Sequence, residues 1–210
     1  MPPLALAACL RGHAFGIKKD DGKMTPVRVV RPRVSYTDLQ QAPEDGRRYE
    51  LYDGEVFVVP APIPRHQLAV QNLEDRLRSY QRSYGGLVLV SPIDIVFSEF
   101  DVVQPDVVFF SRDHVHLVDP DRPIRDAPDL AVEVLSPSTA DTDRGKKMQM
   151  LARYGVPEYW LVDPRARTLE IYRLSADTYV LEQIASDGDI ARSAILPNLS
   201  FPAREIFGDW

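Results

Sequence analysis

The sequence predicts a single α/β domain built on a mixed β-sheet, and two observations favour this class. From residue 64 onward, segments with helical and strand periodicity follow one another in the order helix, strands, helix, strand. One of the strand segments, 129–135, is apolar on both faces except at Glu133, which is typical of a central strand covered on both sides. The chain of 210 residues is long enough for one sizeable core and short for two.

The N-terminal part of the chain differs from the rest. Residues 1–34 have no clear periodicity, so we expect a flexible extension followed by one domain at 35–210. Leu6-Ala7-Ala8-Cys9 looks like a lipoprotein cleavage box, but no basic residue precedes it and its apolar run is short. A disordered leader, with Met24 as an alternative start, is the competing interpretation. The single cysteine and the lack of a long apolar run favour a cytoplasmic protein without membrane contact.

The first structural elements are a hairpin and a helix. Asp53-Gly54 separates two runs rich in β-formers, 49–52 and 55–59, which predicts an added N-terminal hairpin. A proline-rich break at 60–64 follows, and proline is well tolerated in the first turn of a helix. The helix that we expect there carries an apolar stripe at helical spacing and ends at Gly85-Gly86; the stripe consists of Val70, Leu73, Leu77, Tyr80 and Tyr84.

The remaining elements alternate between strands and helices. Strands are expected at 87–91, 93–97, 102–110, 129–135 and 158–162, because β-branched and aromatic residues dominate these runs. A helix is expected from about 140 to 154, with Met148, Leu151 and Ala152 on its inner face. Two further strands, near 169–173 and 179–184, predict a C-terminal antiparallel pair, and a short helix is expected near 203–207.

Two carboxylates within predicted strands are the main functional signal. Asp106 lies in the segment 102–110 and Glu133 in the central strand. A buried carboxylate is costly unless it is paired, protonated or bound to a metal. A divalent cation would explain both at once, and oxygen ligands suit Mg²⁺ or Mn²⁺. The alternative is that each carboxylate pairs with a buried arginine or caps a neighbouring element.

A lysine that could complete such a site lies on the second helix. At about 100° per residue, Lys146 points away from the core, while Lys147 lies at the edge of the buried face and can reach back toward the strand ends. Arg144 lies nearer the centre of that face and competes for the same role. Without Glu133, a solvated helix end would be the simpler interpretation of all three cations.

Several spaced motifs resemble one known family. Over about 36–207 the sequence is similar to the Uma-type restriction endonucleases, bacterial members of the PD-(D/E)XK nuclease superfamily. The motifs that carry the resemblance are Tyr49-Glu50-Leu51-Tyr52-Asp53-Gly54-Glu55, Gln104-Pro105-Asp106, the run from Asp129 to Thr139, Asp143-Arg144-Gly145-Lys146-Lys147, and the run from Tyr154 to Pro164. The resemblance implies a restriction-endonuclease-like fold.

The resemblance also implies an activity and a site. Asp106 and Glu133 match the two acidic residues that hold Mg²⁺, with Mn²⁺ as an alternative. The usual lysine two residues after the second acid is replaced here by Leu135, and Lys147 matches the position to which Uma-type members have moved it. The implied reaction is metal-dependent hydrolysis of DNA phosphodiesters, and nuclease folds of this kind commonly form homodimers.

Three residues are supporting candidates, and one alternative function stays open. Glu50 either joins the acidic cluster or pairs with a neighbouring arginine, His66 opens the first helix and could face the same cleft, and Gln104 belongs to the first acidic motif. A net charge of −6 weighs against a protein that coats nucleic acid. The alternative is therefore a catalytically silent nuclease fold that binds nucleic acid or a protein partner.

Overall fold

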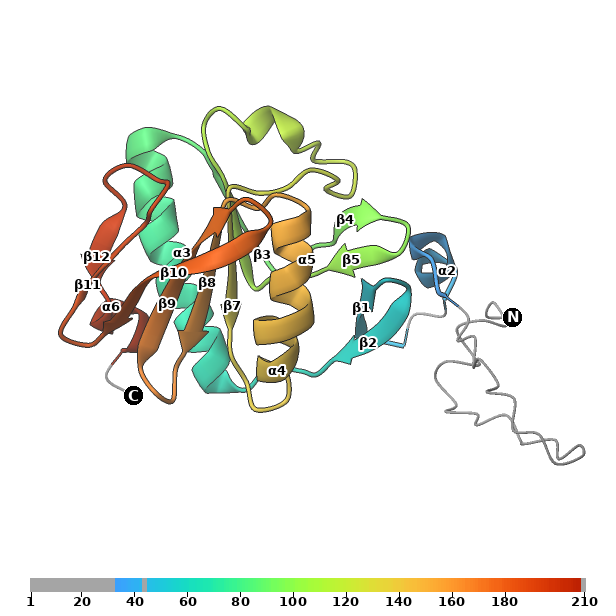
Figure 1. Ribbon diagram of the computed structural model, residues 1–210, viewed down its shortest axis with the longest axis horizontal. Helices are drawn as coiled ribbons and strands as arrows, with labels where there is room; N and C mark the ends of the chain where they lie inside the picture. Colours follow the sequence, from blue (N-terminus) through green and yellow to red (C-terminus); the bar gives the residue numbers. More distant parts are fainter. Residues whose placement is uncertain (1–32, 43–44, 209–210) are drawn as a thin grey trace, which may run out of the picture.

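A six-stranded mixed sheet forms the centre of the fold, which we describe from a computed structural model for residues 33–42 and 45–208 (Figure 1). Its strand order is β10-β9-β8-β7-β6-β3. These strands comprise β3 (Leu87–Val90), β6 (Val107–Phe110), β7 (Leu130–Val134), β8 (Glu158–Asp163), β9 (Thr168–Ser175) and β10 (Thr178–Ser186). β7 pairs in parallel with β8 and antiparallel with β6, so the segment expected to be central lies inside the sheet.

Helices cover both faces of this sheet. On one face lies α3 (Pro64–Tyr84), which buries Leu73 and Leu77 against a core that includes Trp160 and the short α6 (Arg204–Phe207). The other face is covered by one continuous helical segment made of α4 (Ala140–Thr142), the π-helical turn η2 (Asp143–Lys147) and α5 (Met148–Arg153). Figure 1 shows α5 in front of the sheet and α3 behind it, which confirms the predicted mixed sheet flanked by helices.

A smaller sheet of order β2-β1-β5-β4 stands beside the main one. It contains β1 (Arg48–Tyr52), β2 (Glu55–Val59), β4 (Ile95–Ser98) and β5 (Asp101–Val103). The predicted hairpin is present, because β1 and β2 pair antiparallel around Asp53 (φ 52°) and Gly54 (φ 77°), the positive angles that a tight hairpin turn requires. Val34 is fully buried in this sheet's own core, so the expected extension already belongs to the domain at its last residue.

The remaining elements are short. They comprise α2 (Tyr36–Gln40), the 3₁₀ turn η1 (Val115–Leu117), β11 (Ile190–Arg192) and β12 (Ser200–Pro202), the last two forming a ribbon that was not expected. The predictions made for Cys9 and Met24 fall outside the described residues. In the part of the chain that the structure describes, no helix is long and apolar enough to span a membrane.

One predicted strand is wrong, and the error concerns the site. The segment 102–110 is two strands in different sheets, β5 and β6, so Asp106 lies in the link just before β6 and not inside a strand. Pro105 has no N–H to donate to a ladder, and the Gln104 N–H donates instead to the Glu50 carboxylate (N···Oε1 2.8 Å). The chain therefore leaves one sheet and enters the other at this link.

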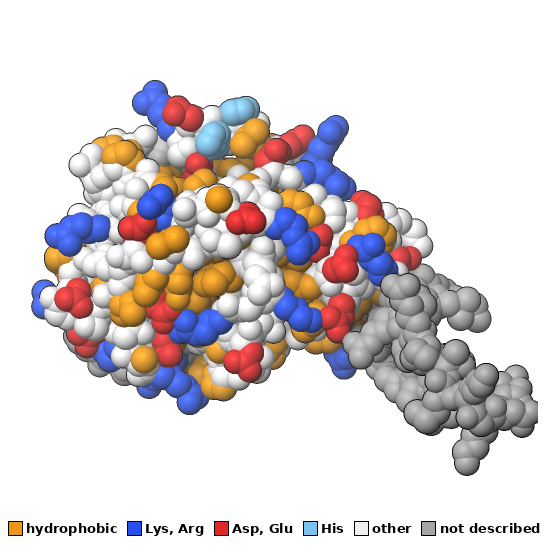
Figure 2. All heavy atoms as spheres, in the orientation of Figure 1, with side chains coloured by type: hydrophobic (Ala, Val, Ile, Leu, Met, Phe, Trp, Pro, Cys, Tyr) orange, Lys and Arg blue, Asp and Glu red, His pale blue; other side chains and the backbone are white. Residues whose placement is uncertain are grey.

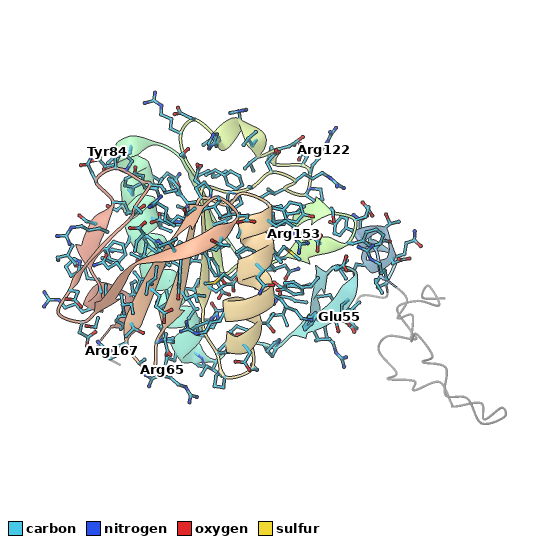
Figure 3. All side chains as sticks on the ribbon, viewed as in Figure 1. Glu55, Arg65, Tyr84, Arg122, Arg153 and Arg167 are labelled. Atoms are coloured by element: carbon cyan, nitrogen blue, oxygen red, sulfur yellow. The ribbon has the colours of Figure 1, made fainter. Side chains whose placement is uncertain are left out.

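Two details of the helices also differ from expectation. Tyr84, placed on the apolar stripe of α3, is 47% exposed, and Figure 3 shows it at the opposite end of α3 from Arg65. On the second helical segment, Met150 is buried with Leu151 and Ala152, while Met148 is only partly buried. The π turn causes the second difference, because its wider turn changes the angular position of every residue after it.

Candidate functional site at the end of the central strand

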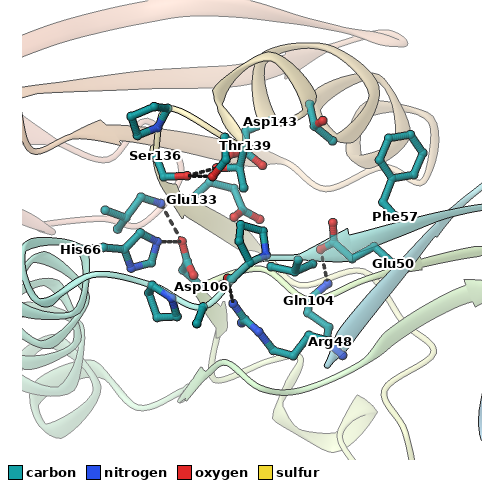
Figure 4. A pocket seen from close by; sticks show the side chains of 18 of the residues that line it. Arg48, Glu50, Phe57, His66, Gln104, Asp106, Glu133, Ser136, Thr139 and Asp143 are labelled. Atoms are coloured by element: carbon teal, nitrogen blue, oxygen red, sulfur yellow. Dashed lines mark hydrogen bonds and ion pairs between the residues drawn. The ribbon is translucent and has the colours of Figure 1, made fainter. Parts of the chain in front are cut away.

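A cavity of about 330 Å³ opens where the main sheet meets the smaller one (Figure 4). Its walls are the segment 60–63, which follows β2, and the segment 136–139, which follows β7. All six residues of interest from the sequence line it: Glu50, His66, Gln104, Asp106, Glu133 and Lys147. The fold therefore brings together residues that are up to 97 positions apart (147 − 50) in the sequence.

The two acidic residues meet because their strands are neighbours. Val107 of β6 is paired with Val132 of β7, which places Asp106 beside the end of β7 and next to Glu133. The Val134 N–H donates to Asp106 (N···Oδ2 2.8 Å), and His66 Nε2 lies 3.1 Å from the same oxygen. The Asp106 and Glu133 side chains are only 10% and 5% exposed, so both lie deep in the cavity.

Lys147 reaches this acidic pair from the π turn. Its Nζ lies 2.8 Å from Glu133 Oε1, 2.9 Å from Glu50 Oε1 and 3.5 Å from Asp143 Oδ1. The lysine side chain is 4% exposed, which makes it a buried cation held by three carboxylates. These contacts place Lys147 where the sequence predicted it, but much deeper than the edge of the buried face.

The π turn also determines which of the three cations of this segment, Arg144, Lys146 and Lys147, faces the cavity. Within η2, Asp143 and Lys147 both face inward. Arg144 faces outward and donates two hydrogen bonds to the Glu170 carboxylate (Nη1···Oε2 2.6 Å, Nη2···Oε1 2.7 Å), so its candidacy is wrong. Lys146 pairs with Glu55 (Nζ···Oε2 2.6 Å), which agrees with its predicted outward direction.

Burial and mutual proximity govern the ionisation of the cluster. Burial raises the pKa of Glu133 well above its ordinary value, and the nearby charges of Asp143, Asp106 and Glu50 add to the effect while Lys147 opposes it. Burial likewise raises the pKa of Asp143. Burial alone would lower the pKa of Lys147, but Glu133 and Glu50 outweigh it and hold that pKa well above its ordinary value. Lys147 is therefore charged, and the carboxylates around it outnumber it.

This surplus of carboxylates is what a cation would neutralise. Glu50, Asp106, Glu133 and Asp143 all line the cavity, and Lys147 is the buried cation among them. Asp106 Oδ1 and Glu133 Oε2 accept no hydrogen bond from residues 33–42 and 45–208, and Asp143 Oδ2 is buried without a partner in the same ranges. In the described chain no three His, Cys, Asp or Glu side chains hold an ion unaided. A divalent cation held by these carboxylate oxygens would therefore need further ligands from water or from a substrate phosphate, as Mg²⁺ commonly takes them.

The supporting candidates play distinct parts. Glu50 joins the cluster, receives the Tyr52 hydroxyl (OH···Oε2 2.7 Å) and does not pair with Arg47 or Arg48. The amide of Gln104 donates to Asp94 (Nε2···Oδ1 2.6 Å), while its buried Oε1 has no partner among the described residues.

Two residues of the site were not predicted. Asp143 and Arg48 both line the cavity, and neither was singled out from the sequence. The four-residue spacing between Asp143 and Lys147 was a usable signal for the first, because such a pair shares a helix face. No local pattern marks Arg48, since its place in the cavity depends on how the two sheets meet.

Comparisons with known proteins agree with this architecture. The chain resembles a crystal structure described as a "putative nuclease belonging to DUF820" from Anabaena variabilis, with a TM-score of 0.68 and 18% identity over 83% of this chain and 97% of that one. A search of curated proteins found no significant match. The family model described as "Putative restriction endonuclease" matches residues 36–204, and the chain therefore belongs to this family, Uma2.

Proposed function

We propose that this chain is a metal-dependent phosphodiester hydrolase, a DNA endonuclease, in which Asp106 and Glu133 hold Mg²⁺ or Mn²⁺. Membership of a nuclease family supports the general activity. One observation carries the specific proposal: Asp106, Glu133 and Lys147, which come from three separate segments of the chain, meet in one cavity with the Lys147 Nζ atom 2.8 Å from Glu133. A buried, mixed-charge cluster in a cleft is an arrangement typical of catalytic sites.

The protein residues have separate tasks in this reaction. When bound, the cation supplies polarisation of the phosphate and lowers the pKa of an attacking water. Asp106 is held by the Val134 N–H through Oδ2, which leaves Oδ1 as the oxygen that would hold a cation. Lys147 orients the attacking water and neutralises the charge that develops on the phosphate. The walls at 60–63 and 136–139 limit bulk water, which strengthens these interactions.

Cleavage assays with matched variants test this proposal. Supercoiled plasmid and single-stranded DNA are incubated with the protein in Mg²⁺, in Mn²⁺ and in EDTA. Asp106→Asn, Glu133→Gln and Lys147→Met are each expected to lower the cleavage rate by about a hundredfold or more, because each removes a group that acts in the transition state. Glu182→Gln, which alters an exposed carboxylate paired with Arg173, is the control and keeps full activity.

Titration calorimetry with Mn²⁺ separates this function from its alternative. Binding by the wild type that is lost in Glu133→Gln would support a metal at the two acidic residues. Cleavage that survives in both Asp106→Asn and Glu133→Gln would refute the assignment of the site. DNA binding without cleavage, equal in the wild type and both variants, would favour a catalytically silent nuclease fold. Homodimer formation remains a prediction, which light scattering of the purified chain tests.

A further inference from the structure

The depth of the cavity restricts what can reach the acidic pair. Glu133 and Asp106 lie at its floor with side chains 5% and 10% exposed, beneath walls formed by 60–63 and 136–139. Both wall segments contain proline, which stiffens them: Pro60 and Pro62 on one side and Pro137 on the other. The volume of about 330 Å³ is near the lower limit of ordinary ligand pockets. Such a space suits one nucleotide and not a groove that follows a duplex.

An intact DNA duplex does not fit into this cavity. Each of its phosphates is held on the outside of a stiff rod, and only deformation of the duplex moves one phosphate away from its neighbours. Enzymes that do chemistry on a base in a deep pocket use single strands or extract the nucleotide from the stack, and a phosphate that must reach the floor of a deep cavity meets the same restriction. On the face shown in Figure 2, moreover, Lys and Arg side chains alternate with Asp and Glu and form no continuous basic strip. On α3, Arg76 and Arg78 pair with Glu205 and Glu74.

Besides Lys147, the cavity is lined by an arginine that is suited to a phosphate. Arg48, on β1, lines it and is partly buried, and Figure 4 shows it close to Gln104. Its guanidinium donates to two neutral acceptors, Ser91 Oγ (Nη1···Oγ 2.6 Å) and the Pro60 carbonyl (Nη2···O 3.4 Å). Among the described residues no carboxylate forms an ion pair with it. A guanidinium positioned by neutral groups keeps its full charge for an anionic ligand.

Exposed apolar side chains at the cavity are suited to the uncharged part of a nucleotide. Ile63 is 50% exposed and Val58 is 45% exposed, although both are apolar and both line the cavity. Apolar surface at a pocket mouth gives a sugar or base a face against which to pack, which is how proteins bind single strands without reading their sequence. Arg165, an exposed cation on the link between β8 and β9, lines the same mouth and can contact a second phosphate.

We infer that the cavity admits a single-stranded segment or a frayed end of DNA, with Arg48 binding a phosphate next to the one that is cut. This inference rests on the proposed nuclease function and names its substrate class. One nucleotide enters between the two proline-containing walls, and its phosphate lies over Asp106 and Glu133. Continuous base-paired DNA is a poor substrate, because a nucleotide must first leave the stack before its phosphate can reach the floor of the cavity.

The test compares one oligodeoxynucleotide in three forms: single-stranded, blunt duplex, and duplex with a single-stranded tail. In Mg²⁺ we expect cleavage of the single strand and of the tail to exceed that of the blunt duplex by about tenfold or more, because withdrawal of a nucleotide from a duplex loses pairing and stacking. Binding is measured separately by fluorescence anisotropy in Ca²⁺, and we expect the same order of affinity there.

The Arg48→Gln variant tests the proposed phosphate contact. It is expected to weaken single-strand binding by about tenfold, with Arg48→Lys intermediate, since a lysine keeps the charge but not the planar fork. Arg173→Gln, which alters an exposed arginine paired with Glu182, is the control and binds as the wild type does. Thermal unfolding of each variant shows whether the fold is retained.

The outcomes separate this inference from the proposed function. Equal cleavage of blunt duplex and single strand would overturn the inference and leave the nuclease function standing. Absence of all cleavage, with single strand still bound more tightly than duplex and weakened by Arg48→Gln, would retain the inference about the ligand and refute the enzyme. Equal or absent binding of both forms, or unchanged single-strand binding in Arg48→Gln, would overturn the inference.

Discussion

The replacement Lys147→Met tests whether the buried cluster is one electrostatic unit. The lysine is 4% exposed and lies 2.8, 2.9 and 3.5 Å from three carboxylates, so no water can replace it without rearrangement. Methionine preserves most of the volume but leaves buried carboxylates without their cation. Removing one partner of a buried ion pair costs about 3–5 kcal/mol. We expect Lys147→Met to lower the free energy of unfolding by that amount at neutral pH in EDTA.

A double variant shows where this cost originates. Glu133→Gln alone should cost less than the about 1.5–3 kcal/mol of a hydrogen bond to a charged group, because it also removes a buried negative charge from a cluster in which carboxylates outnumber the lysine. In Lys147→Met/Glu133→Gln one of the uncompensated charges is gone, so the double variant should be more stable than the sum of the single changes by about 1–2 kcal/mol. Urea unfolding followed by the fluorescence of buried Trp160 measures all of these values.

The neighbouring lysine provides the matched control. Lys146→Met removes an exposed pair with Glu55, whose side chains are 49% and 44% exposed, and should cost less than about 1 kcal/mol. If Lys147→Met cost no more than Lys146→Met, Lys147 would not be the buried cation described here. Strict additivity in the double variant would show that Lys147 and Glu133 act independently, and the reasoning from buried charge would fail.

Three further predictions concern neighbouring features. The hydrogen bonds from Arg144 lower the pKa of Glu170 in the folded state. The stability that Glu170 contributes is therefore present above its unfolded pKa and is lost as the pH falls through its folded pKa. Glu170→Gln should remove this pH dependence from acid unfolding curves. Gly86→Ala should cost at least about 2 kcal/mol in urea, because its φ of +106° is strained for alanine and a Cβ would collide with β6, whereas a normal unfolding curve would show that the backbone relaxes there. His66→Ala should weaken Mn²⁺ binding by about tenfold to a hundredfold in calorimetry, because it frees Asp106 to turn, and unchanged affinity would exclude this positioning role.

Local patterns in the sequence predicted most of the fold. The Asp-Gly turn predicted the β1–β2 hairpin because the turn geometry depends on those residues alone. The apolar stripe at helical spacing identified α3, and the run around Glu133 identified the central strand, because burial on both faces leaves a continuous apolar segment. The family itself was recognisable from spaced motifs, and the family model confirms it.

The errors occurred where distant segments determine local structure. The sequence showed an uninterrupted β-rich run at 102–110, but the chain changes sheets there, since the Gln104 N–H is taken by a carboxylate from β1. The regular 100° helix placed Arg144 nearer the core than Lys147, whereas the π turn reverses this order. A π turn is retained only when contacts elsewhere compensate for it, and here Lys147 gains three carboxylates.

The sequence alone thus determined most of the secondary elements, the family and the three residues Asp106, Glu133 and Lys147 as candidates, because motif spacing and periodicity are local properties of the chain. Only the tertiary structure decided how deeply these side chains are buried, which residues they contact and how large the cavity beside them is. Distances such as that from Lys147 to Glu50 depend on how the two sheets and the helical segment pack. Burial raises the cost of every unpaired charge, and burial is a property of the packed molecule that no single segment contains.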